Sequence, residues 1–186
     1  MINKFLELNK KILNNYLSQN QIAIVDRARP VSAILSSLII SAIANRKKMN
    51  TIIITDNLYK DIIKIYKSFG FNNFFIVSCF KNYVSNIFCT ILSIINTIHG
   101  IYKIYFFGFQ KFINKFYVNK VHVGDLIYDS YIRNNLNFIN PKVDIKLLKI
   151  IFFACFKTYK LGIFFKKYKI KYLFVSTDCY STNEAI

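Results

Sequence analysis

The chain has 186 residues, enough to bury a sizeable core and most simply to form one domain. Hydrophobic residues make up 54%, aromatic residues 17%, and there are 5 glycines and 2 prolines, which excludes a disordered or low-complexity protein. The net charge is +17, but lysines occur in nearly every segment together with abundant Asn, Ile and Phe, a composition typical of AT-rich coding. We therefore expect an affinity for anionic surroundings and disfavour nucleic acid as the specific partner.

The cysteines are widely spaced and form no C-x-x-C pair, and the chain has only two histidines. This pattern predicts no zinc site, and neither a metal nor a cofactor is expected. Reduced thiols in a cytoplasmic protein are the default interpretation. Residues 1–17 mix lysine and glutamate with apolar side chains, so they lack the apolar core of an export signal.

Two apolar stretches raise the question of a membrane span. Residues 31–44 are too few to cross a bilayer. Residues 87–109 are long enough, but Asn96, His99 and Lys103 interrupt them where a span should be most apolar. Residues 31–44 are therefore interpreted as a buried helix, and a membrane span over residues 87–109 is disfavoured.

Apolar runs and helical periodicity alternate along the first half of the chain. The pattern predicts helices over residues 2–18, 31–45 and 58–69, and strands over residues 21–25, 51–55 and 74–77. The strands are continuous apolar runs, which is typical of strands buried on both faces. We therefore expect an α/β, Rossmann-like fold with a mostly parallel sheet and helices on both faces.

The second half continues this pattern less regularly. Residues 82–98 have helical periodicity, whereas residues 101–107 fit either a strand or a buried helical turn. A short strand over residues 120–123, a helix from about residue 125, a loop over residues 134–142, a long helix over residues 144–167 and a last strand over residues 172–175 complete the prediction.

Polar side chains follow each predicted strand. In an open parallel sheet, ligands bind outside the carboxyl ends of the strands. The alternative is that these residues only cap the helices that follow. The positions concerned are Asp26 and Arg27, Thr55 and Asp56, Ser78, Gly124 and Asp125, and Ser176, Thr177 and Asp178.

Residues 121–133 stand out because two acids and an arginine occur at helical spacing. Asp125, Asp129 and Arg133 fall at i, i+4 and i+8, on one face of a helix. Either this is a capped helix with an ordinary exposed ion pair, or it is a polar cluster at a strand end. In the second case Asp125 and Asp129 are the catalytic candidates, as general base and electrostatic partner, provided that burial raises a carboxyl pKa. His122 is expected to be a core residue.

The segment over residues 124–133, GDLIYDSYIR, resembles the G-D-L-I-Y-D-x-Y-x-R segment of bacterial surface-carbohydrate and capsule polysaccharide biosynthesis proteins. Those proteins resemble GT-B glycosyltransferases, which have two Rossmann-like halves. Residues 22–27, the helix after Asp144 and residues 176–180 add to the similarity. The last of these resembles an S-H-x-x-Y turn, with Thr177 in place of the histidine.

This resemblance implies that residues 1–186 form a single Rossmann-like domain, the amino-terminal half of a longer two-domain protein. Such a half supplies the acceptor side of the cleft of a cytoplasmic transferase that uses a nucleotide-sugar donor and a glycan acceptor, and is incomplete as a catalyst. Peripheral contact with the anionic inner membrane surface is a further expectation. The alternative is a non-catalytic basic module that binds an anionic membrane or nucleic acid. Besides the catalytic candidates, the residues expected to bind substrate are Asp26, Arg27, Gly124, Arg133, Ser176, Thr177, Asp178 and Tyr180.

Overall fold

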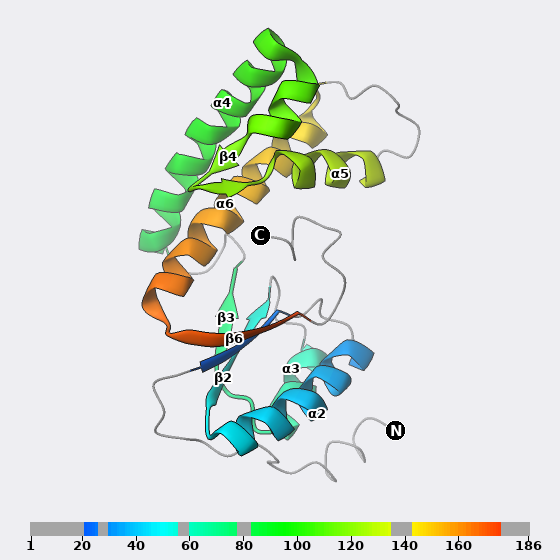
Figure 1. Ribbon diagram of the computed structural model, residues 1–186, viewed down its shortest axis with the longest axis vertical. Helices are drawn as coiled ribbons and strands as arrows, with labels where there is room; N and C mark the ends of the chain where they lie inside the picture. The colour runs from blue at the N-terminus through cyan, green and yellow to red at the C-terminus, as the bar shows by residue number, and fades with distance from the viewer. Residues whose placement is uncertain (1–20, 26–29, 56–59, 78–82, 135–142, 176–186) are drawn as a thin grey trace. The chain divides into compact units, whose positions relative to one another are not determined.

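The computed structural model describes residues 21–25, 30–55, 60–77, 83–134 and 143–175 (Figure 1). The chain divides into two compact units. The first comprises Met1–Ser78 and Phe165–Asp178, and the second comprises Cys79–Phe164 and Cys179–Ile186. In chain order, the second unit is inserted into the first. That the whole chain is one domain and half of a longer protein stays a prediction, and each unit is described by itself.

The first unit alternates strands and helices as predicted. Its elements are β1 (Gln21–Val25), α2 (Pro30–Lys47), β2 (Asn50–Thr55), α3 (Lys60–Ser68), β3 (Phe74–Ile76) and, after the second unit, β6 (Ile170–Val175). Proline begins α2, where its missing N–H has no helical partner to lose. The chain leaves α3 through Gly70, whose φ of 96° is readily adopted only by glycine.

The four strands form one parallel sheet in the order β3-β2-β1-β6. Strands β1, β2 and β3 are added in one direction, whereas β6 lies on the opposite side of β1. This arrangement confirms the predicted α/β, Rossmann-like class. It also places a reversal of strand order between β1 and β6.

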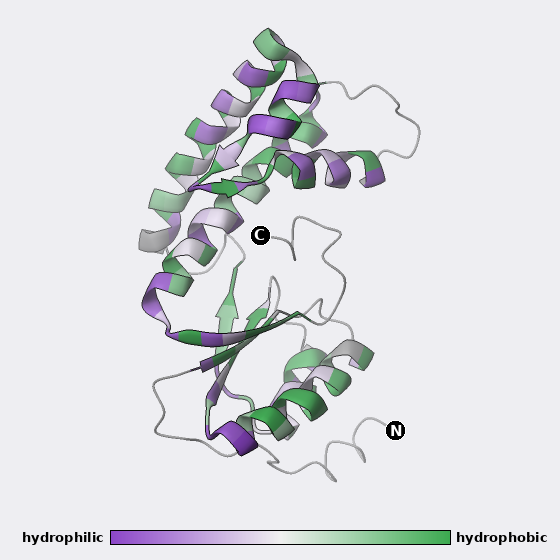
Figure 2. Ribbon diagram, in the orientation of Figure 1, coloured by the Kyte–Doolittle hydropathy of each residue, from purple (hydrophilic) through white to green (hydrophobic). Residues whose placement is uncertain are grey.

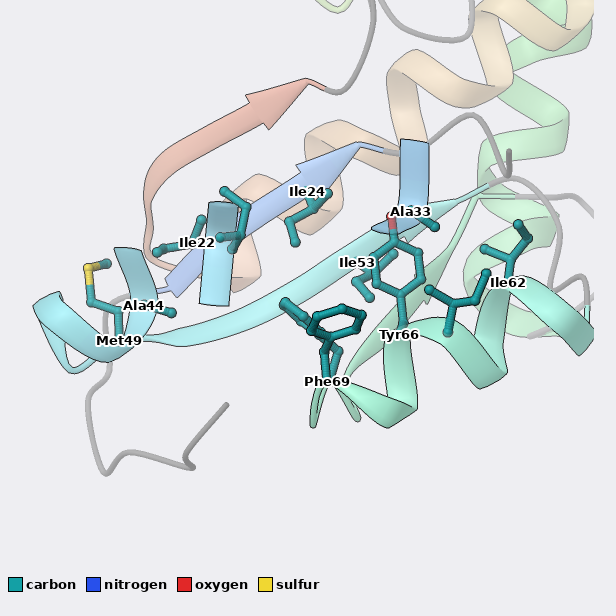
Figure 3. Packing of buried hydrophobic residues seen from close by; sticks show 12 residues of the cluster. Ile22, Ile24, Ala33, Ala44, Met49, Ile53, Ile62, Tyr66 and Phe69 are labelled. Atoms are coloured by element: carbon teal, nitrogen blue, oxygen red, sulfur yellow. The ribbon is translucent and has the colours of Figure 1, made fainter. Parts of the chain in front are cut away.

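Helices α2 and α3 pack against one face of the sheet (Figure 3). Ile22 and Ile24 of β1 and Ile53 of β2 point to this face and share a core cluster with Ala33, Ala44 and Tyr66 of the helices. On the opposite face Ala23, Ile52 and Ile54 are also buried, which confirms that β1 and β2 are buried on both sides. A helical layer on that second face stays a prediction.

The second unit contains α4 (Tyr83–Lys115), β4 (Tyr117–Val118), β5 (Val121–His122), α5 (Gly124–Asn134) and most of α6 (Ile145–Lys167). Residues 101–107 belong to α4, so the helical alternative holds there and the strand is wrong. Helix α4 is kinked at Gly108, which has a φ of 78°. Its carboxyl-terminal part, the hairpin, α5 and α6 share a second core cluster that includes Phe112, Phe116 and Ile127.

The predicted strand over residues 120–123 belongs to a small hairpin and not to the parallel sheet. β5 pairs antiparallel with β4 in a separate two-stranded sheet. Asn119 and Lys120 make the turn, with φ values of 49° and 69°, as a type I′ turn requires. The expectation that Gly124 and Asp125 follow a strand of the main sheet is therefore wrong.

The predicted helix over residues 2–18 and residues 135–142 of the predicted loop lie outside the described residues.

Candidate functional site

The reversal of strand order lies between β1 and β6, where open parallel sheets bind ligands outside the strand ends. Val25, the last residue of β1, pairs with Val175, the last residue of β6. The residues that follow these two ends in sequence are therefore attached to neighbouring, parallel strands. They include six predicted substrate-binding residues, which lie outside the described part of the chain: Asp26, Arg27, Ser176, Thr177, Asp178 and Tyr180.

The remaining predicted site residues lie on α5 in the second unit. Gly124 begins this helix directly after the hairpin, and Asp125, Asp129 and Arg133 follow within it. The segment over residues 124–133 thus forms the predicted helix, but after an antiparallel strand. We next consider which of its side chains build the fold and which are exposed.

One side of α5 packs into the second unit. Gly124, Ile127, Ser130 and Tyr131 are buried. A Cβ atom on Gly124 would lie 2.5 Å from the carbonyl oxygens of Phe112 and Ile113, so the end of α4 leaves no room for a side chain there. The glycine of the segment therefore serves the close approach of two helices.

Tyr131 links α5 to the start of α6. Its hydroxyl donates to Asp144 Oδ2 over 3.1 Å, and Asp144 Oδ1 accepts a hydrogen bond from the Leu147 amide over 2.7 Å. Asp144 thereby caps α6 at the predicted position. The role of Tyr131 in the segment is structural.

Among the charged residues of the segment, Asp125 and Arg133 are exposed and Asp129 is half-buried. Arg133 Nε lies 2.9 Å from Asp129 Oδ2, and the two side chains are 54% and 44% exposed. Such an i, i+4 pair contributes only about 0.3–0.5 kcal/mol to stability. Asp125 lies in the first turn, where the helix dipole favours a negative charge, and its Oδ1 accepts from the Leu126 amide over 2.9 Å.

His122 is half-buried and contacts Asp125, so its interpretation as a core residue is wrong. Its Nε2 lies 2.7 Å from the Ile113 carbonyl oxygen, and its Nδ1 lies 3.5 Å from Asp125 Oδ1. The Tyr117 ring covers the imidazole at a centroid distance of 4.9 Å. Because a carbonyl can only accept, Nε2 carries a proton, and Nδ1 donates toward Asp125 when the imidazole is protonated. His122 therefore lies beside Asp125 at the start of α5.

These contacts restrict the chemistry available to the two acids. Side-chain exposures of 56% for Asp125 and 44% for Asp129 do not supply the burial on which the acid–base interpretation depends. Both carboxylates instead offer oxygen acceptors at a wet surface, and Arg133 adds donors. Within the described part of the chain, no three His, Cys, Asp or Glu side chains gather as metal ligands would.

The structure contains a polar network between α4 and α6 that the sequence did not predict. Lys160 Nζ donates to Asn86 Oδ1 over 3.0 Å, and both residues are nearly fully buried. Asn96 Nδ2 donates to the Tyr159 hydroxyl over 2.7 Å. Asn86 and Asn96 are ten positions apart on α4, about 80° out of phase around the helix, so their spacing did not indicate a shared helix interface.

Cys155 lies in the core of this unit, where burial raises the pKa of its thiol from 9.0 to about 12. Between these pH values the unfolded chain binds fewer protons than the folded one, so the free energy of unfolding falls as pH rises. The slope is about 1.4 kcal/mol per pH unit at most. We expect urea midpoints of the wild type to fall more steeply above pH 9 than those of Cys155→Ala. Equal slopes would contradict a buried, protonated thiol.

The structure brings Asp125 to His122 and Asp129 to Arg133 on the surface of α5. The other predicted substrate-binding positions, apart from Gly124, lie outside the described residues. Comparison of the chain with protein-family models, with curated proteins and with solved structures found no match.

Proposed function

We propose that this chain acts in the biosynthesis of a bacterial surface polysaccharide, as a glycosyltransferase-like component whose exposed α5 surface binds the glycan acceptor. The resemblance of the segment over residues 124–133 to proteins of that pathway supports the proposal. The Rossmann-like sheet of the first unit is consistent with a GT-B half.

The observation that carries the proposal is the division of this segment into two sides. Its buried residues account for the packing of α5, whereas Asp125, Asp129 and Arg133 lie at least partly in solvent and contribute little to stability. The carboxylate oxygens and the guanidinium group on this side of α5 are accessible from solvent, so a ligand can reach them.

The exposed side of α5 suits a carbohydrate. Asp125 and Asp129 accept hydrogen bonds from hydroxyl groups, and Arg133 donates to ring or hydroxyl oxygens. Tyr128 is half-buried and falls on the same helical face by its spacing from Asp125. A tyrosine ring offers an apolar surface with a polar edge, which complements the alternating polarity of a pyranose.

The first unit contributes separately. Strand order reverses at β1 and β6, and Arg27 follows the end of β1 in sequence. In the proposed two-domain transferase, the nucleotide-sugar donor is held mainly by the other half, and the residues after β1 and β6 stay predicted substrate-binding residues of the first unit. The net charge of +17 favours anionic substrates of this kind.

The proposal predicts that the chain binds glycans through α5. On a microarray of bacterial surface saccharides, the wild type should bind a subset of glycans, and Asp125→Asn/Asp129→Asn should bind them at least tenfold more weakly, about 1.4 kcal/mol. Asp61→Asn is the matched control, because Asp61 is an exposed acid of α3 in a 3.7 Å pair with Lys64. Absence of binding by the wild type, or undiminished binding by the double variant, would refute the acceptor role.

A further inference from the structure

In the amino-terminal two-thirds of α4, small and polar residues are buried and large apolar residues are exposed. One side of this part of α4 carries buried small or polar residues, Asn86, Cys89, Ser93, Thr97 and Gly100. Ser93 and Thr97 turn their hydroxyls back to carbonyl oxygens four residues earlier. A helix of a water-soluble protein normally places such residues outward and its isoleucines inward.

The opposite side of α4 is apolar and exposed. Hydrophobic residues recur along the whole helix (Figure 2). Exposed fractions reach 62% at Ile98 and 80% at Tyr105. We call this side the α4 outer face; it consists of Ile87, Phe88, Ile91, Ile94, Ile95, Ile98, Tyr102, Tyr105 and Phe106.

The α4 outer face has a graded composition. Its first part is mostly isoleucine, with Phe88, and aromatic residues occupy its last part, next to the kink at Gly108. There Lys111 Nζ lies 4.3 Å from the centroid of the Phe107 ring. Aromatic rings beside lysines are typical of the headgroup region of a bilayer, where both the apolar ring and the cation are stabilised.

We propose that the α4 outer face docks on the surface of a bilayer that contains anionic phospholipid. Small residues toward the neighbouring helix and large apolar residues outward are the distribution found in helices that face lipid. The net charge of the chain favours an anionic bilayer over a second copy of the chain as the partner of this face. A net charge of +17 attracts anionic headgroups, whereas two copies of the chain repel one another.

The helix lies along the bilayer surface in this proposal. Residues Asn86–Lys115 are long and apolar enough to span a membrane by length and composition. However, α4 is held to α6 by the Asn96–Tyr159 and Asn86–Lys160 contacts, and α6 exposes Lys146 and Lys149. A helix with these exposed cations is stable in water or among headgroups, so its partner α4 inserts only its outer face.

The absence of tryptophan from the chain makes a local test simple. Tyr102→Trp places a fluorophore on the α4 outer face, and Tyr172→Trp places one at a similarly exposed tyrosine of β6. On addition of vesicles of phosphatidylcholine with phosphatidylglycerol, the emission of Tyr102→Trp should move to shorter wavelength and be quenched by brominated acyl chains. The emission of Tyr172→Trp should not change.

Vesicle flotation then tests the face as a whole. Ile91→Gln/Ile95→Gln/Ile98→Gln should partition onto anionic vesicles at least tenfold more weakly, whereas Leu35→Gln/Leu38→Gln/Ile39→Gln on α2 should partition like the wild type. Circular dichroism verifies that both variants are folded. Wild-type binding to pure phosphatidylcholine should be much weaker than to anionic vesicles.

Three results would overturn this docking surface: flotation of the α4 variant like the wild type, equal binding to neutral vesicles, or no vesicle binding together with self-association that the α4 variant abolishes. The last would assign the face to a second copy. None of these results bears on glycan binding, which is measured without lipid and on another helix, so the two proposals fail independently.

Discussion

Replacing Gly124 by alanine is expected to destabilise the second unit strongly. The added Cβ would lie 2.5 Å from the carbonyl oxygens of Phe112 and Ile113, which are backbone atoms and cannot rotate away. Helices α4 and α5 must therefore separate, and overpacking of this kind costs about 1–3 kcal/mol or more. Urea denaturation followed by far-UV circular dichroism would measure the loss.

Gly162→Ala is the matched control for this prediction. Its added Cβ would meet only the Asn119 side-chain amide, at 2.7 Å, and that group can move. Alanine also favours a helix over glycine by about 1 kcal/mol. We therefore expect Gly162→Ala to be neutral or stabilising. Equal stability of Gly124→Ala and the wild type would show that Gly124 is not required for packing.

Replacing Asn86 by leucine is expected to cost about 3 kcal/mol. The change removes an acceptor from Lys160 Nζ, which is buried and also lies 5.6 Å from the centroid of the Phe156 ring. Hydrogen bonds to charged groups contribute about 1.5–3 kcal/mol, and removal of one partner of a buried pair is at the upper end of that range or above it.

A double substitution separates the effect of losing the Asn86–Lys160 hydrogen bond from the effect of leaving the lysine charge buried. Asn86→Leu/Lys160→Met removes both polar groups, and an apolar pair of similar volume in a protein interior is often as stable as a buried polar one. The double variant should therefore recover most of the stability that Asn86→Leu loses. A double variant as unstable as the sum of the single variants, in the same urea assay, would contradict coupling between the two side chains.

The strands of the main sheet could be predicted from the sequence because they are unusually apolar. Residues 51–54 form the β-branched run TIII, and helical periodicity starts again within the next ten residues. Burial on both faces produces such runs in parallel sheets. The order of the strands in the sheet could not be predicted from the sequence. Strand β6 follows a unit of more than eighty residues, so its pairing with β1 is entirely non-local.

Single residues made the hairpin and the full length of α4 difficult to predict from the sequence. Asn119-Lys120 adopts a turn for which Asn-Gly is the usual signal, so the hairpin has no glycine to mark it. The predicted helix ended at residue 98, whereas Gly100 lies within α4. Its position is explained by the Phe112 and Phe116 rings, which would be 3.2–3.3 Å from an added Cβ.

For the site, the sequence predicted the helix, its charged face and the partner of Asp129, but not the partner of Asp125. The spacing of Asp129 and Arg133 was sufficient to predict their ion pair. No local pattern indicated that His122 would lie against Asp125, since that contact depends on the turn between β5 and α5 and on the carbonyl of Ile113.

The most direct test of the proposed acceptor surface measures stability and glycan binding on the same variant. Asp125→Asn/Asp129→Asn should unfold in urea with a free energy within about 0.5 kcal/mol of the wild type, because exposed pairs contribute little. The same preparation should lose glycan binding on the microarray. A variant that loses stability but still binds glycans would contradict the account, because the exposed acids would then serve the fold and not a ligand.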